Sequence, residues 1–274
     1  MTAKKKNIRN LILYVLAFNI VGWLGYFIAV GGGTVDAMGL GNLIWLAAPL
    51  LLSLLFRLFG KDWKDIGLRL YFKGNGKWYL FSIIVFPLII VVVLLVGRVF
   101  GAVSFANFNV GLFLGALVAL FAQTFIKNIF EEFAWRGYLT PKVNVVVKQP
   151  IIGHLIVGFI WGTWHLPYYL GLLDRASLAG YTTQSMGIFL PLVILGMTLA
   201  GILFGEMRLI TGSTWPALLM HTMSNILILS LLMEGFVEIN PVAELVFTPS
   251  WEGILTMVLV TAAGLWLYRQ REKK

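Results

Sequence analysis

The stretch EEFAWR, residues 131–136, places two carboxylates and a guanidinium at the end of a long apolar run, residues 111–134. A run of this length is long enough to cross a bilayer, which takes about 20 residues. Charged side chains are costly next to hydrocarbon, and in membrane segments they mark sites that bind or react. The stretch therefore predicts a membrane helix and a functional site that includes Glu131, Glu132 and Arg136.

The composition of the whole chain is that of a membrane protein. Of its 274 residues, 59% are hydrophobic and 12% are charged, whereas soluble domains are about 25% charged. We therefore expect one all-α polytopic membrane domain over residues 1–274. The chain has no cysteine, which excludes disulfides, thiolate metal ligands and a cysteine nucleophile. Its net charge of +9 is concentrated at segment ends and in short loops, so it does not indicate nucleic-acid binding.

Apolar segments of membrane-spanning length recur along the chain. They predict a bundle of about eight transmembrane helices. The segments cover residues 11–30, 40–59, 78–99, 111–134, 151–172, 187–204, 215–233 and 251–268.

Lysine and arginine are concentrated in alternate connections between these segments. Such connections face the cytoplasm by the positive-inside rule, which predicts a multi-pass plasma-membrane protein with both termini in the cytoplasm. The connection after the seventh segment carries Glu234, Glu238 and Glu244 and no basic residue. Residues 61–77 mix basic with apolar side chains and are predicted to lie along the inner membrane surface.

The spacing within residues 131–136 separates the two carboxylates by role. Successive helical residues are rotated by about 100°, so Glu132 and Arg136 share a face and are predicted to pair. Glu131 points away from Arg136 and is free for proton transfer, and a carboxylate in an apolar site suits a general base. Lys127, on the same face as Glu131, would oppose that effect of burial. The alternative interpretation is a set of charges that reach for the membrane surface from a helix end.

Two later segments contribute histidines. His221 and Asn225 share a helix face, and an imidazole beside a carboxamide can donate hydrogen bonds to a developing oxyanion. The alternative for this pair is polar contact between helices. His165 follows Trp161 by one turn and precedes Pro167, which should distort the helix. A lone histidine in a membrane helix is more often a packing residue than a catalyst.

Depth in the membrane favours a different histidine. Counted from the predicted inner ends of their helices at 1.5 Å per residue, Glu131 lies about 8 Å deep and His221 about 9 Å deep. His165 lies about 21 Å deep on the same count. His154 is nearer the inner boundary and on nearly the same face as His165, so depth alone favours His154.

Three motifs in this order resemble the CAAX-protease and bacteriocin-processing (CPBP) membrane proteases, which include Rce1-like prenyl-protein endopeptidases and abortive-infection proteins. The family pattern is Glu-Glu-x-x-x-Arg, then Phe-x-x-x-His, then His-x-x-x-Asn or Asp. Residues 131–136 fit the first motif and residues 221–225 fit the third. The second is met by His165, with Trp161 where the family usually has Phe. His154 has no aromatic residue four positions before it, so the resemblance selects His165.

The resemblance covers about residues 111–228, the expected protease core. It implies a helical bundle around a water-filled cavity open to the cytoplasm, and cleavage of peptide or lipid-modified protein substrates near that membrane face. Membrane lipids are the other expected partners. The resemblance implies that Glu131 and His165 activate a water molecule. It assigns the binding of the oxyanion to His221 and Asn225. The site would be supported by Glu132, Arg136 and Trp161.

Alternatives to this interpretation stay open. Glu131, His165 and His221 are legitimate zinc ligands, and three ligands plus a water make a catalytic zinc site. We favour a mechanism without a cofactor, because the sequence has no His-Glu-x-x-His helix and no clear second carboxylate to act as a base beside zinc. A non-enzymatic immunity or scaffold protein is a further alternative. A transporter that uses these groups as a proton relay predicts inverted repeats, and the sequence shows none.

Overall fold

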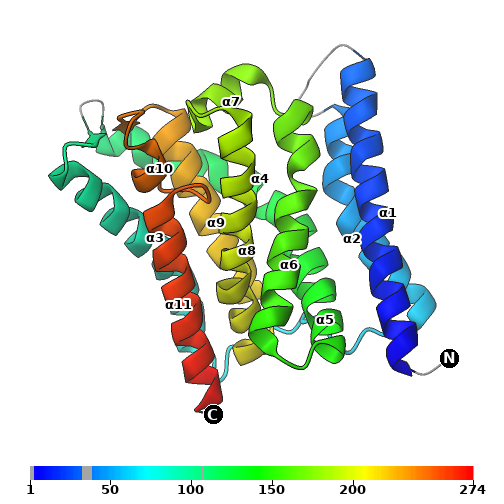
Figure 1. Ribbon diagram of the computed structural model, residues 1–274. Helices are drawn as coiled ribbons and strands as arrows, with labels where there is room; N and C mark the ends of the chain where they lie inside the picture. Colours follow the sequence, from blue (N-terminus) through cyan, green and yellow to red (C-terminus); the bar gives the residue numbers. More distant parts are fainter. Residues whose placement is uncertain (1–2, 33–38, 106–107, 274) are drawn as a thin grey trace.

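The computed structural model describes residues 3–32, 39–105 and 108–273, and it is almost entirely helical (Figure 1). The prediction of an all-α polytopic membrane protein is confirmed. The long helices are α1 (Ala3–Gly31), α2 (Leu40–Gly60), α3 (Gly76–Val99), α4 (Val110–Ala134), α6 (Pro150–Trp164), α8 (Met186–Thr211), α9 (Trp215–Ile228) and α11 (Ile254–Glu272).

Shorter elements join these helices. Two-residue strands form one antiparallel pair, and three π-helical turns interrupt or extend helices that carry predicted site residues. The short elements are α5 (Thr140–Val146), α7 (Arg175–Tyr181), α10 (Glu244–Phe247), β1 (Val103–Ser104), β2 (Glu238–Ile239), η1 (Trp135–Leu139), η2 (Tyr168–Leu172) and η3 (Leu229–Met233).

Six helical stretches among the described residues are long and apolar enough to cross a membrane. The chain is therefore an integral membrane protein with several transmembrane helices. Helix α6 has 15 residues, fewer than the about 20 that a span needs, and α11 is also outside the six. The predicted total of eight spans stays a prediction.

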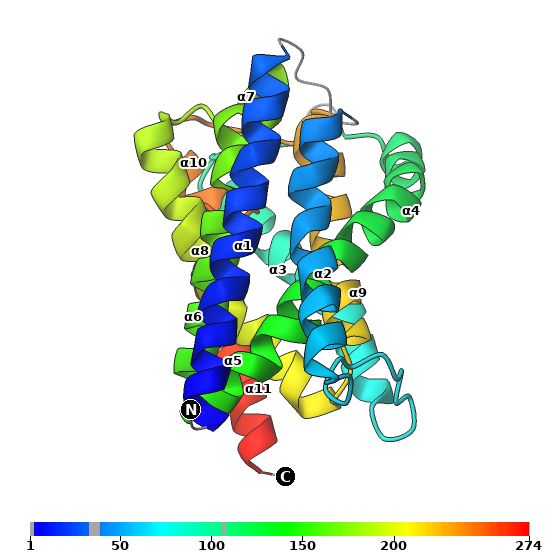
Figure 2. The same ribbon diagram turned by 90° about the vertical axis from the view of Figure 1, so that its right-hand side faces the viewer.

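Both described ends of the chain lie at the same end of the bundle (Figures 1 and 2). We call this the terminal end. The connection 61–75, the turn between α5 and α6 and the turn between α8 and α9 also lie there, whereas α7 and α10 lie at the far end. The direction of each helix follows: α4 runs towards the terminal end, and α6 and α9 run away from it.

The fourth apolar segment does not end at Ala134 as predicted. The helix continues through η1 and α5 to Val146, in one stretch of 37 residues. Arg136 is fully buried, so the interpretation of these charges as a cluster reaching for the membrane surface is wrong. The inner end of the helix therefore lies beyond Arg136.

This longer helix removes the depth argument for His154. Glu131 lies fifteen residues before Val146, and His165 lies fifteen residues after Pro150. The two helices run in opposite directions from a short turn, so groups at equal distances from that turn are about level in the bundle.

Glycines bring α6 close to α8 and so fix the helix that carries Trp161 and His165. A Cβ atom on Gly158 would lie 2.5 Å from the carbonyl oxygen of Thr198, and one on Gly201 would lie 2.4 Å from that of His154. Small residues at such crossings let membrane helices pack at close range. Any larger residue at either position would push α6 away from α8.

Two arginines hold the π-helical turn η1 in place. Arg57 of α2 donates to the carbonyl oxygen of Gly137, and Arg208 Nε of α8 donates to that of Arg136 at 3.1 Å. A π-helical turn disturbs the regular ladder of helical hydrogen bonds, and the two guanidinium groups bind carbonyls at that disturbance. Arg208 also donates to the carbonyl oxygen of Asp65 at 2.6 Å, which ties the connection 61–75 to the turn.

Candidate active site

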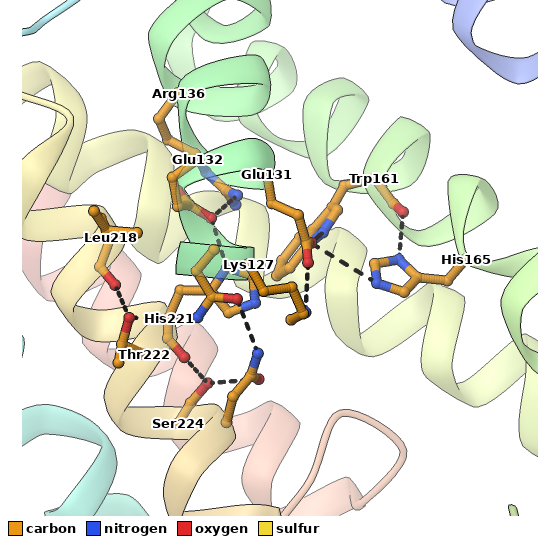
Figure 3. A network of polar contacts seen from close by, with 12 residues as sticks. Lys127, Glu131, Glu132, Arg136, Trp161, His165, Leu218, His221, Thr222 and Ser224 are labelled. Atoms are coloured by element: carbon orange, nitrogen blue, oxygen red, sulfur yellow. Dashed lines mark hydrogen bonds and ion pairs between the residues drawn. The ribbon is translucent and has the colours of Figure 1, made fainter. Parts of the chain in front are cut away.

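The predicted site residues converge on one network of polar contacts (Figure 3). Glu131 and Glu132 come from α4, Trp161 from α6, and His221 from α9, while His165 follows the last residue of α6. All five side chains are at least nine-tenths buried. Segments that are far apart in the sequence therefore meet around one pair of carboxylates.

Glu131 has a partner on each carboxylate oxygen. Lys127 Nζ donates to Oε1 at 2.6 Å, and the indole Nε1 of Trp161 donates to Oε2 at 3.0 Å. His165 Nε2 lies 3.9 Å from the same Oε2. That distance is too long for a direct hydrogen bond, and it leaves room for a water molecule in contact with both atoms.

The hydrogen bond on the other side of the His165 ring determines which nitrogen can accept a proton. Its Nδ1 lies 2.9 Å from the carbonyl oxygen of Trp161. A carbonyl can only accept, so Nδ1 carries the hydrogen and Nε2 of the neutral ring is left as an acceptor. His165 and Glu131 therefore present two acceptors to the same small space.

Glu132 forms the predicted ion pair with Arg136, at 2.8 Å between Oε1 and Nη1. Its Oε1 also accepts from His221 Nδ1 at 2.9 Å. The Arg136 guanidinium lies over the rings of Trp161 and Phe204, with its central carbon 4.5 Å and 4.4 Å from the ring centroids. Cation–π contact thus supplements the single carboxylate in a buried site.

The orientation of His221 determines how it can assist a reaction. Its Nδ1 is used on Glu132, so only Nε2 is free to face a substrate. Nε2 can donate to an oxyanion only when both ring nitrogens carry hydrogen, as in the imidazolium ion. Glu132 is placed to stabilise that positive charge.

Asn225 is held by a residue that the motif does not include. Its Nδ2 donates to Oδ1 of Asn128 at 3.2 Å, and Asn128 Nδ2 donates to Thr222 Oγ1 at 3.4 Å. Asn128 is fully buried in α4. Its position one turn before Glu131, as a polar residue inside an apolar run, was a signal that sequence reasoning did not use.

His154 lies in a different polar cluster. Its Nε2 lies 3.0 Å from Glu206 Oε1, and Glu206 Oε2 accepts from Arg271 Nε at 2.7 Å. This cluster joins α6, α8 and α11 near the terminal end. The structure therefore brings His165, and not His154, to Glu131.

A cavity of about 220 Å³ adjoins the site. Its lining includes Lys127, His165, His221 and Asn225. From these residues the lining continues towards the far end of the bundle. In α4 it follows residues that precede Lys127. In the segments after α6 and α9 it follows residues that come after His165 and Asn225. The continuing residues are Leu120, Gln123, Thr124, Tyr168, Tyr169, Ile228 and Leu229.

This direction bears on two expectations from the sequence. The cavity lining leads away from the terminal end, whereas the sequence predicts termini in the cytoplasm and a cavity that faces the cytoplasm. Which end faces the cytoplasm stays a prediction.

The contacts of the residues proposed as zinc ligands bear on the zinc alternative. Within the part of the chain that the structure describes, no three His, Cys, Asp or Glu side chains are grouped so that they could hold a metal ion. The Glu131 carboxylate is bound instead by the Lys127 cation, and His221 Nδ1 by Glu132. A zinc ion on Glu131 would therefore have to compete with the Lys127 cation.

Comparison with known proteins identifies the part of the chain that holds this site. Residues 113–227 match the family described as Rce1-like, type II CAAX prenyl endopeptidase. This segment belongs to the Rce1-like family. No curated protein matches the chain. The match implies a protease, a hydrolase of peptide bonds, and the matched range contains α6, α8 and most of α4 and α9.

Proposed function

We propose that the protein is an intramembrane endopeptidase, similar to CAAX prenyl protease 2, in which Glu131 and His165 activate a water molecule. The observation that carries the proposal is the 3.9 Å gap between Glu131 Oε2 and His165 Nε2 beside the cavity. Both atoms are acceptors, so a water in the gap donates one hydrogen to each. Its oxygen lone pair is then directed at whatever lies in the cavity.

The reaction follows from this arrangement. The water oxygen attacks the carbonyl carbon of a peptide bond, and its proton passes to the Glu131 carboxylate. The tetrahedral intermediate collapses when that proton is delivered to the amide nitrogen and the C–N bond breaks. The products are a new carboxyl terminus and a new amino terminus.

His221 and Asn225 are placed to hold the oxyanion of the intermediate. The imidazolium form of His221 donates from Nε2, with Glu132 accepting from Nδ1. Asn225 Nδ2 carries two hydrogens, and its bond to Asn128 uses one and leaves the other for the cavity. Donors of this kind, fixed before the reaction, commonly contribute about 10²- to 10³-fold to the rate.

We propose that this mechanism uses no metal, because the Lys127 cation already pairs with the Glu131 carboxylate that a zinc ion would need. Activity measured before and after chelation checks this point. Activity lost to a chelator and restored by zinc would support the alternative zinc-dependent protease.

The proposed substrates are peptides or lipid-modified proteins, with membrane lipids as the surrounding partners and no role for nucleic acid. We propose the plasma membrane as the location and the cytoplasm as the side of both termini. The non-enzymatic alternative is an immunity or scaffold protein. The buried, fully assembled site argues against it, because two ion-paired carboxylates are costly to keep in a membrane without a function.

The test is cleavage of fluorogenic peptides by the purified protein in detergent. We expect Glu131→Gln to abolish turnover, and Glu234→Gln, which changes an exposed carboxylate outside the site, to leave it unchanged. Turnover by Glu131→Gln at the rate of the unaltered protein would contradict the assignment.

A further inference from the structure

We infer that the active-site cavity opens to the outer side of the membrane, so that the site acts on polypeptide segments located outside the cytoplasm. The inference depends on the proposed function for the statement that the bound chain is cleaved. The side of access itself follows from the helix directions, the cavity lining and the charges of the two ends.

The cavity lies on one side of the catalytic groups. Its lining residues in α4, such as Gln123, precede Lys127, and α4 begins at the far end. Tyr168 follows His165 on the way to the far end, and Leu229 follows His221 in the same direction. The three segments thus form walls that lead from the site to the far end of the bundle.

The other side of the site is closed. Trp135, Arg136 and Leu218 are fully buried on the terminal side of the two carboxylates, and Tyr138 is 4% exposed. None of these residues is part of the cavity lining. Further towards the terminal end, Arg57 and Arg208 bind the carbonyls of η1 and tie down the chain there. A substrate that came from the terminal end would have to displace this packing.

The charges of the two ends identify which one faces the cytoplasm. The connection 61–75 at the terminal end contains Lys61, Lys64, Arg69 and Lys73. Basic residues between the site and the far end are few among the described residues. They are Arg98, Lys127 and Arg175, and Lys127 is ion-paired within the site. The acidic residues of that part of the molecule are Asp174, Glu234, Glu238, Glu244 and Glu252. The positive-inside rule therefore places the terminal end in the cytoplasm and the cavity opening outside.

The lining also indicates what kind of chain fits. Aromatic rings of Trp45, Trp161, Tyr168, Tyr169 and Trp251 surround the cavity. Such walls bind apolar or aromatic side chains by excluding water. The proposed substrate is thus an exported or membrane-anchored chain that presents apolar residues at the outer surface of the membrane.

The absence of cysteine from the sequence makes the side of access directly measurable. Single cysteines are introduced in the cavity (Gln123→Cys), on the far end (Val242→Cys) and in the connection 61–75 (Lys64→Cys). Gln123 and Lys64 are exposed, and Val242 is 92% exposed. Spheroplasts of an expression host that contain each variant are treated with a bulky maleimide that cannot cross membranes, before and after the membranes are opened.

We expect Gln123→Cys and Val242→Cys to label in intact spheroplasts and Lys64→Cys to label only in opened membranes. We also expect labelled Gln123→Cys, once solubilised, to lose peptide cleavage, and labelled Val242→Cys to keep it. The inference would be overturned if Gln123→Cys, like Lys64→Cys, were labelled only after the membranes are opened. An inverted pattern, or failure of Gln123→Cys to label even in detergent, would also overturn it.

Labelling does not require turnover, so it separates this inference from the proposed function. Gln123→Cys combined with Glu131→Gln should label like Gln123→Cys alone. The expected labelling, together with cleavage that does not depend on Glu131, would support the side of access and overturn the catalytic assignment.

Discussion

The indole Nε1 of Trp161 donates a hydrogen bond to Glu131 Oε2 at 3.0 Å. The family that the sequence motifs resemble usually has phenylalanine at this position, and a phenylalanine side chain has no hydrogen-bond donor. The same tryptophan packs its ring on Arg136, and its ring is nearly perpendicular to that of His221, with centroids 5.3 Å apart. One side chain therefore contacts the proposed base, the buried cation and the proposed oxyanion donor.

Trp161→Phe should keep the packing and remove the donor to Glu131. A hydrogen bond to a charged group contributes about 1.5–3 kcal/mol, so we expect kcat to fall by roughly one to two orders of magnitude. Steady-state kinetics with a peptide reporter measures the change, and thermal unfolding in detergent is the control. Unchanged kcat with intact folding would show that the indole N–H does not fix Glu131.

Glu132→Gln should damage both stability and activity. It leaves the buried Arg136 without a carboxylate, which commonly costs about 3–5 kcal/mol, and it removes the negative charge beside His221. The double variant Glu132→Gln with Arg136→Met removes both charges and should recover most of the lost Tm without activity. Recovery of activity in the double variant would show that Glu132 acts through stability alone.

Asn128→Ala should reduce turnover without removing any motif residue. Asn225 would lose the acceptor that orients its amide, and we expect kcat to fall by about tenfold, less than the ~10²- to 10³-fold typical for loss of an oxyanion donor. Asn19→Ala is the matched control, because the amide of Asn19 donates to the carbonyl oxygen of Val15 in its own helix, far from the site. Equal kcat in the two variants would contradict the role of Asn128.

The two buried histidines of α6 and its end should respond differently to substitution. His165→Ala should abolish cleavage while Tm changes little, because the ring lies beside the cavity. His154→Ala should lower Tm and keep kcat, because it leaves Glu206 with one partner fewer. Loss of turnover in a folded His154→Ala protein would indicate that His154, the histidine that membrane depth alone favoured, takes part in catalysis.

Acid should weaken the attachment of the connection 61–75. Burial alone would raise the pKa of Asp65, but hydrogen bonds and charges from Lys142 and Arg57 outweigh it and hold that pKa below its usual range. A carboxyl with a lowered folded-state pKa contributes stability above its unfolded pKa, about 3.9, and loses it as pH falls through the folded pKa.

We therefore expect the Tm difference between the unaltered protein and Asp65→Asn to be constant from about pH 5 to 8 and to shrink below about pH 4. Thermal unfolding in detergent across this range measures it. A difference that persists unchanged at the lowest pH would show that the ionised carboxylate does not hold the connection.

Sequence reasoning located the helices because membrane spans depend on length and apolarity, which are local properties. It placed Glu132 opposite Arg136 because helix geometry fixes neighbours four residues apart. It ended the fourth helix too early because the charge of Arg136 resembled a membrane boundary, whereas Trp161 and Phe204, far away in the sequence, bury it.

Contacts between helices could not be predicted in the same way. The bond from His221 to Glu132 and the bond from Asn225 to Asn128 depend on how α9 packs against α4, which no spacing within one segment determines. The direction in which the cavity extends could not be predicted from the sequence either. It depends on the end of the bundle at which α4, α6 and α9 move apart. The catalytic roles of these residues remain predictions until variants are measured.

The ion pairs of the site come in matched sets: Lys127 with Glu131, and Arg136 with Glu132. The resting site is therefore electroneutral when His221 is neutral, so the long-range field that four isolated ions would create in a low-dielectric bundle largely cancels. Protonation of His221 adds one uncompensated positive charge next to the reacting carbonyl. The site thus acquires the sign that attracts an oxyanion at the place where one forms.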